Sequence, residues 1–156
     1  MVRDQVVAAW RTPEAAAIPA DAHIRDADPA EHGGLYDAAQ QLTGLLRSVK
    51  GVGWTTAYKV LHIKRPSLFP LLDARLRQTY RQAEAEWRTD HPSVRPGGRN
   101  FWAVIRADVI DPFNRSSLER SRETFRRESP LRPLTGLSDV RLLDILAWRL
   151  AGPNGS

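Results

Sequence analysis

The chain has 156 residues, a formal net charge of +5 and an isoelectric point near 10.2. Its 42% hydrophobic and 26% charged residues are the balance of one soluble domain with a modest core. The absence of cysteine excludes disulfides, thiolate zinc sites and iron–sulfur clusters, and the lack of any apolar run of about 18 residues excludes a membrane span, so we expect a cytoplasmic protein.

Helical patterns recur along the first half of the chain, and alternating strand patterns do not. A short helix is expected over residues 2–10, and the prolines and glycines of residues 11–33 predict an irregular surface segment. Apolar residues then recur every three or four positions from Leu35 to Leu46, which is typical of an amphipathic helix. A tight turn at 48–53 leads to a second helix over 55–63.

The second half continues the helical pattern. We expect a helix over 74–87 with Asp73 as its N-cap, a loop over 89–99 and a helix over 101–109. An arginine- and glutamate-rich helix follows over 116–128, capped by Ser116 or Ser117. The last helix runs from Ser138, its expected N-cap, to about residue 150; it is apolar nearly all round, so it is expected to be central to the core. The prediction is an all-α fold, one compact helical domain over 1–156.

Residues 45–64 predict a helix-hairpin-helix motif. An apolar helix, a Gly51-Val52-Gly53 turn and a helix that opens with small residues follow one another. The first amides of the second helix have no partner within it, and they lie at the positive end of its dipole, where an anion is stabilised. The glycines let a phosphate approach the backbone. A plain corner between two helices, where glycines are common, remains the alternative.

The residues around this turn are the expected DNA contacts. The hydroxyls of Thr55 and Thr56 add hydrogen-bond donors, Lys50 and Lys59 add charge, and Trp54 either wedges into the minor groove or covers the turn. The backbone positions expected to meet the phosphate are Gly51, Val52 and Gly53, with the Val52 side chain tucked into the core. Such contacts read no bases.

The charge by itself leaves nucleic-acid binding open. Lysine occurs only at positions 50, 59 and 64, so arginine carries most of the positive charge. Arginine pairs well with phosphate, but a GC-rich genome produces the same composition. Arginines alternate with glutamates over 115–128, which favours a salt-bridged, solvated helix face, with a second phosphate-contacting surface as the alternative.

From Leu45 to about Leu76 the chain resembles the helix-hairpin-helix core of the base-excision DNA glycosylase superfamily. The matching segments are Val49-Lys50-Gly51-Val52-Gly53, Thr56-Ala57, the prolines from 66 to 70, and Leu71-Leu72-Asp73. Asp73 lies twenty positions after Gly53, which matches the family's spacing from hairpin to catalytic aspartate.

This resemblance implies a role for Asp73 as the carboxylate that stabilises the sugar cation while a flipped-out base leaves, and that activates water. It also implies a monovalent cation held by the main-chain carbonyls of Arg47, Val49 and Val52. Arg75 stands where the family has a histidine, and we count it among the DNA contacts.

The chain departs from that family at several positions. Thr55 replaces the nucleophilic lysine of bifunctional members, so Schiff-base lyase chemistry is not expected. Lys50 replaces the hairpin proline, and only about 45 residues precede the hairpin. The chain also resembles an uncharacterised actinobacterial family with a Gly-Val-Gly-Trp-x-Thr-Ala hairpin and a closing motif that Leu143-Asp144 and Trp148 match; no activity comes with this likeness.

We therefore expect a DNA-binding protein without sequence specificity that contacts the phosphate backbone and is non-catalytic or catalytically degenerate. DNA is the expected partner, and no cofactor is expected beyond the monovalent cation. A role as a helix cap alone also accounts for Asp73. Two alternatives remain: a monofunctional, glycosylase-like enzyme of DNA repair with Asp73 as catalytic carboxylate, and a protein-interaction domain.

Overall fold

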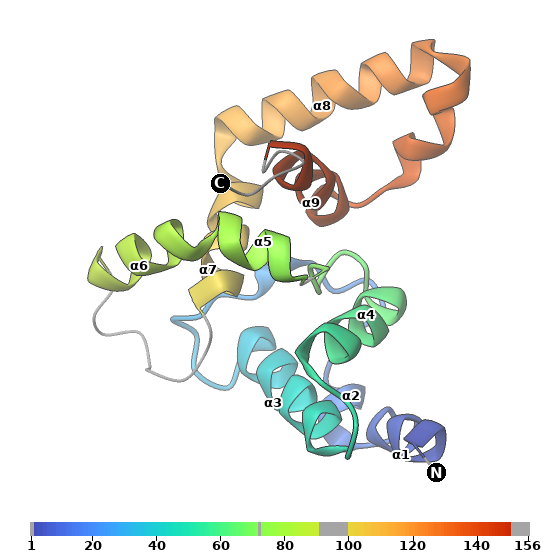
Figure 1. Cartoon of the computed structure of the whole chain (residues 1–156), viewed down its shortest axis with the longest axis vertical. Helices are drawn as coiled ribbons and strands as arrows, with labels where there is room; N and C mark the ends of the chain where they lie inside the picture. The colour runs from blue at the N-terminus through green and yellow to red at the C-terminus, as the bar shows by residue number, and fades with distance from the viewer. Residues whose placement is uncertain (1, 72, 91–99, 151–156) are drawn as a thin grey trace.

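The computed structural model describes residues 2–71, 73–90 and 100–150, and within these ranges the chain is helical and contains no β-strand, so the all-α expectation is confirmed (Figure 1). The α-helices and 3-10 helices are, in chain order, α1 (Val2–Ala9), α2 (Pro13–Ala16), η1 (Ile24–Asp26), α3 (Leu35–Ser48), α4 (Trp54–Lys64), α5 (Ala74–Thr79), α6 (Arg81–Asp90), α7 (Asn100–Ile110), α8 (Pro112–Arg127), η2 (Ser129–Gly136) and α9 (Asp139–Leu150).

The helices form three tiers along the long axis of the molecule (Figure 1). The lowest tier holds α1 to α4, with α3 in contact with α1, α2 and α4. The middle tier holds α5, α6 and α7. The top tier holds α8, η2 and α9, and α9 packs against α5 and α7.

The core is built around α7, whose first residues are apolar all round. Residues 101–105 are all buried, and the ring of Trp102 meets Phe69 and Tyr36 edge-on at centroid distances of 5.2 and 6.0 Å. The expectation that the last helix holds the central place is wrong. In α9 Val140 and Leu142 are buried, but Trp148 keeps 48% of its surface exposed.

Residues 11–33 are irregular but not a surface segment, which corrects that part of the prediction. Ile18, Ile24 and Ala27 are buried in the core, and the segment includes the short helices α2 and η1. The Ile24 amide donates to the Ser67 carbonyl at 2.9 Å, so the segment is tied to the chain that follows α4. Scattered alanines and isoleucines carry no helical period, so their burial left no periodic signal.

The helix expected over 74–87 is divided in two at Tyr80. The backbone amide of the buried Tyr80 donates a hydrogen bond to the Leu76 carbonyl at 3.0 Å and closes α5. Helix α6 begins at the next residue. In α6 the Glu84 side chain accepts a hydrogen bond from the Phe101 amide, which joins α6 to α7. Of the loop expected over 89–99, residues 91–99 lie outside the described residues, and 89–90 belong to α6.

The helix caps follow local sequence rules, with one correction. Asp73 accepts the Leu76 amide at 2.8 Å, and Ser138 accepts the Arg141 amide at 3.2 Å, so both predicted N-caps are confirmed. The arginine-rich helix starts earlier than predicted, with Asp111 as N-cap and proline in its first turn, in place of Ser116 or Ser117. No helix in the described ranges is long and apolar enough to cross a membrane.

We expect Leu46→Ala to lower the free energy of unfolding by about 2–5 kcal/mol, because Leu46 is fully buried in α3 and its truncation leaves a cavity. The matched control is Ile63→Ala in α4, where the side chain is 77% exposed and the change should stay within about 0.5 kcal/mol. Urea denaturation followed by circular dichroism measures both. Equal losses in the two variants would contradict this description of the core.

Candidate functional site

The turn between α3 and α4 is built on two glycines. Gly51 adopts a φ of +88°, which favours glycine, and the Val52 amide closes the turn on the Val49 carbonyl at 3.0 Å. The Val52 side chain is buried, as expected, and anchors the turn to the core. A Cβ added at Gly51 or at Gly53 would meet nothing within 4 Å, so the outer face of the turn is open.

The first turn of α4 opens onto this free face. Gly53 is the N-cap of α4 and supplies no side-chain hydrogen bond to its first amides. Because the first amides of an α-helix have no acceptor within the helix, they remain able to bind an external oxygen. Nothing at Gly53 covers the approach to them, since the position is exposed and lacks a side chain.

Most of the predicted contact residues do gather at this turn. Lys50, Thr55, Thr56 and Lys59 are all exposed. All three lysines of the chain lie on the turn or on α4, because the third is Lys64. The turn therefore combines an open helix N-terminus with exposed hydroxyl groups and exposed positive charges.

Trp54 covers the turn and does not project from it. Its ring stacks on Tyr58 at a centroid distance of 5.9 Å and an interplanar angle of 28°. The Arg47 guanidinium lies 3.6 Å from the Trp54 ring centre in a cation–π contact. Of the two roles considered for Trp54, this packing favours the one in which the ring covers the apolar side of the turn.

Asp73, the predicted catalytic carboxylate, follows α4 in the chain and is the N-cap of α5, whereas the turn precedes α4. Its Oδ1 accepts the Leu76 amide, which accounts for the residue as a helix cap. Asp73 also lines a cavity of about 300 Å³, together with residues of α4, α5 and α9. A cap and a cavity wall are compatible roles, because a carboxylate has a second oxygen.

Asp144 of α9 is the second carboxylate of this cavity, and it is 98% buried. Its Oδ2 accepts the Leu71 amide at 2.8 Å. Burial raises the pKa of Asp144 from 3.8 to about 7; the hydrogen bond from Leu71 and the charge of Arg141 oppose the rise, and the charge of Asp73 adds to it. A buried carboxyl with a raised pKa in a cavity is a common feature of functional sites.

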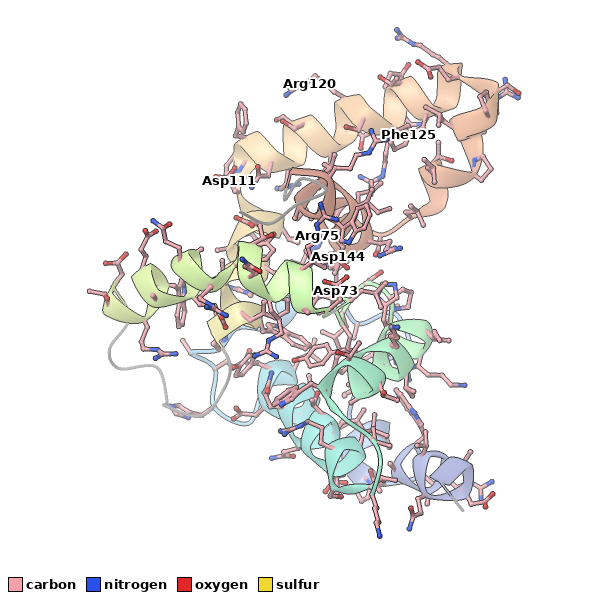
Figure 2. The ribbon with its side chains drawn as sticks, in the orientation of Figure 1. Asp73, Arg75, Asp111, Arg120, Phe125 and Asp144 are labelled. Atoms are coloured by element: carbon pink, nitrogen blue, oxygen red, sulfur yellow. The ribbon has the colours of Figure 1, made fainter. Side chains whose placement is uncertain are left out.

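Figure 2 shows Asp73 and Asp144 close together where α5 meets α9, with Arg75 beside them. The other residues that line the cavity are Lys59, Leu71, Leu76, Arg141, Ile145 and Trp148. Lys59 belongs both to the set of residues around the turn and to the cavity wall. Helix α4 therefore contributes to both candidate features, through Lys59 in the case of the cavity.

Arg75 differs in place from the other predicted DNA contacts. It lies in the first turn of α5, and its guanidinium packs over the Trp148 ring at 4.2 Å. Arg75 therefore belongs with the cavity and with α9, whereas the remaining predicted contacts belong to α4 and its turn.

The arginines of α8 are largely paired within their own helix and with α9. Arg126 and Arg127 bond to Glu123, and Arg126 also bonds to Glu119. Arg122 pairs with Asp139 at the start of α9. This arrangement fits the salt-bridged, solvated face that the alternating charges predict.

No role for Asp144 follows from the sequence analysis, although the sequence contains a signal of its burial. A single carboxylate interrupts the apolar residues from 142 to 148, and a charged residue on a buried face requires a partner. That partner, the Leu71 amide, is 73 residues away in the chain, so no local pattern could identify it.

These features define a small all-helical protein with an open glycine turn and a two-carboxylate cavity. A model described as a family of unknown function (DUF6308) matches residues 9–151, and the chain belongs to this family. No curated protein and no solved structure matches the chain. The matched range includes the turn, Asp73 and Asp144.

The raised pKa of Asp144 predicts a specific effect of pH on stability. Between about pH 4 and pH 7 the folded protein holds a proton that the unfolded chain releases, so the contribution of Asp144 to stability falls as the pH rises. At about 1.4 kcal/mol per pH unit, the interval from 3.8 to about 7 sets an upper limit of about 4 kcal/mol.

Asp144→Asn removes this titration while an amide oxygen still accepts the Leu71 amide. We expect the variant to gain stability relative to the wild type as the pH rises from 4 to 8. Urea denaturation of both proteins across this range measures the difference. A difference that stays constant with pH would contradict a buried carboxyl with a raised pKa.

Proposed function

We propose that the protein binds the phosphate backbone of DNA, without sequence specificity, through a helix-hairpin-helix formed by α3, the turn and α4. One observation carries the proposal: the N-terminus of α4 is open, with free space at Gly51 and Gly53 and no side-chain cap. A phosphate oxygen reaches the amides there without meeting a side chain, and the helix dipole favours its charge.

The side chains around the turn extend this contact. Lys50 and Lys59 supply positive charge, and Thr55 and Thr56 supply hydroxyl donors from exposed positions. Each lysine that neutralises a phosphate releases condensed counterions, so affinity falls steeply as salt rises. Trp54 contributes by holding the turn in shape through Arg47 and Tyr58.

A monovalent cation at the main-chain carbonyls of Arg47, Val49 and Val52 belongs to the same proposal. The Val49 carbonyl already accepts the Val52 amide, and a carbonyl oxygen has a second lone pair for a cation. Such an ion would stabilise the turn and add positive charge beside the bound phosphate.

A second candidate function is supported by the cavity beside Asp73. A monofunctional, glycosylase-like enzyme needs a carboxylate next to a space that accepts a base, and Asp73 lines a cavity of about 300 Å³. Asp73 would stabilise positive charge on the sugar as the glycosidic bond breaks, and it would orient the attacking water. Lys59, on α4, would lie between the strand held at the turn and this cavity.

The first function is tested with Gly53→Glu. We expect the dissociation constant for short duplex DNA to rise by about tenfold or more near 0.1 M salt, because a carboxylate then occupies the phosphate position. The fold should persist, since Gly53 has an ordinary φ of −80° and open space around it. Fluorescence anisotropy over a salt series measures the affinity and its salt slope.

The matched control is Gly136→Glu, which makes the same charge change at an open position of η2, in the top tier and far from the turn (Figure 1). This control should bind DNA nearly as well as the wild type. Equal weakening by both substitutions would indicate a general effect of charge and would contradict a contact at the turn.

The second function is tested with Asp73→Asn and duplexes that carry a panel of damaged bases. The wild type should release at least one of these bases, and the variant should be slower by about a hundredfold or more. Asparagine is also a good N-cap, so the helix is retained. Base release is measured as strand scission after alkali; no release by the wild type across the panel would exclude this function.

A further inference from the structure

A second cavity, of about 440 Å³, lies where η1, α8 and the start of α9 meet. We call it the arginine groove, because three arginines line it: Arg25 of η1, and Arg115 and Arg122 of α8. The other charged or hydroxyl side chains of its wall are Ser116, Glu119 and Asp139. The arginine groove shares no lining residue with the cavity beside Asp73, so the two are separate sites.

Asp139, the first residue of α9, holds two of the three arginines in place. Its Oδ2 lies 3.5 Å from Nη2 of Arg25, and its Oδ1 accepts a hydrogen bond from Nη2 of Arg122. Arg122 also donates to the Leu137 carbonyl at 3.1 Å, and its side chain is only 16% exposed. Because these contacts fix the guanidinium of Arg122 before any ligand arrives, little conformational entropy is lost when a ligand binds it.

The arginines keep donors that the protein does not use. A guanidinium has five N–H donors, and every hydrogen bond or ion pair that the Arg25 side chain makes with the described residues involves Nη2. The exposed Arg115 side chain makes no hydrogen bond and no ion pair with the part of the chain that the structure describes. The groove therefore presents guanidinium donors to a ligand.

The carboxylates of the groove do not cancel its positive charge. Three arginines face two carboxylates, and Asp139 is shared between two of the arginines. Glu119 is bonded at 3.2 Å to Arg126, which adds a further cation from outside the lining. The charge of Arg115 thus has no counter-charge among the described residues. An anion placed in this space is attracted by several arginines at once.

The number of arginines favours one class of anion. Guanidinium groups bind phosphate oxygens in pairs through their planar fork. A phosphate monoester carries nearly two negative charges and three terminal oxygens, whereas a phosphodiester or a carboxylate carries one charge and two such oxygens. Three arginines around one space therefore match the monoester best. A volume of about 440 Å³ lies within the range of small-ligand sites, so it also admits the group that carries the phosphate.

We propose that the arginine groove binds a phosphate monoester, whose terminal oxygens are held by Arg25, Arg115 and Arg122. Two sources share this chemistry: a phosphorylated small molecule, and the phosphorylated end of a DNA strand. The second source rests on the proposed DNA binding, and the first does not. The groove lies in the top tier and the glycine turn in the lowest, so a substitution at one site leaves the other in place (Figure 1).

The first test is calorimetric titration of the full chain with ribose 5-phosphate at about pH 8, where the monoester carries two charges. The matched probe is ribose, which lacks the phosphate and should not bind measurably. Arg115→Gln should weaken the binding of ribose 5-phosphate by about tenfold or more, because it removes one charged, two-bond contact. The fold should persist, since the Arg115 side chain is exposed and holds no described residue in place.

The matched control is Arg120→Gln, which removes the same charge from the same helix. Arg120 donates to the Ser117 hydroxyl at 2.8 Å and does not line the groove, and Figure 2 shows it on the side of α8 that faces away from α9. This variant should bind ribose 5-phosphate nearly as well as the wild type. Arg25→Gln, at the other side of the groove, should weaken binding as Arg115→Gln does. Circular dichroism of each variant confirms that it is folded.

The source is read from two short DNA strands of one sequence, one with a 5′-phosphate and one with a 5′-hydroxyl group, in fluorescence anisotropy. Tighter binding of the phosphorylated strand, lost in Arg115→Gln, identifies the strand end as the ligand. Binding of ribose 5-phosphate without a preference between the strands identifies a free ligand. Gly53→Glu should weaken both strands alike, so a failure of the DNA contact at the turn is seen separately from a failure of the groove.

Two results would overturn the proposal. One is the absence of ribose 5-phosphate binding up to about 1 mM together with equal binding of the two strands. The other is an equal loss of binding in Arg115→Gln and Arg120→Gln, which would indicate a general effect of charge on α8 and no site in the groove.

Discussion

The hydrogen bond from the Leu71 amide to the Asp144 carboxylate joins two parts of the chain that are 73 residues apart. It places α9 against the segment that precedes α5, and the cavity forms along this contact. The bond also explains why a carboxylate is tolerated in the buried face of α9, since a buried acceptor needs a donor. The raised pKa of Asp144 and its position opposite Asp73 both follow from this placement.

The sequence was sufficient for most features that short-range geometry decides, although it misplaced the N-cap of α8. The Gly51-Val52-Gly53 turn, with Val52 inside and open space outside, follows from glycine's conformational freedom and from the apolar residues on either side. The N-caps Asp73 and Ser138 follow from the ability of short polar side chains to accept the first amides of a helix. That the turn belongs to a helix-hairpin-helix, and that it contacts DNA, are both proposals.

The features that the sequence did not reveal depend on distant contacts. The division of a predicted helix at Tyr80 accompanies the packing of α6 on α7, where Glu84 accepts the Phe101 amide. The burial of Ile24 depends on a bond to Ser67, more than forty residues away in the chain. The residues next to Asp144 in the sequence show it only as an interruption of an apolar helix. Folding of the chain brings it beside Asp73. The geometry of the glycine turn could therefore be predicted, whereas the cavity could not.

The proposed DNA contact depends on the open amides at the start of α4, and amide NMR tests these amides most directly. A titration of ¹⁵N-labelled protein with a short DNA duplex reports on each backbone amide separately. We predict that the largest shifts fall on the amides of residues 53–56, with smaller shifts at Lys50 and Lys59. Shifts confined to α8, with the amides of the turn unchanged, would contradict the assignment of the α3–α4 turn as the DNA contact.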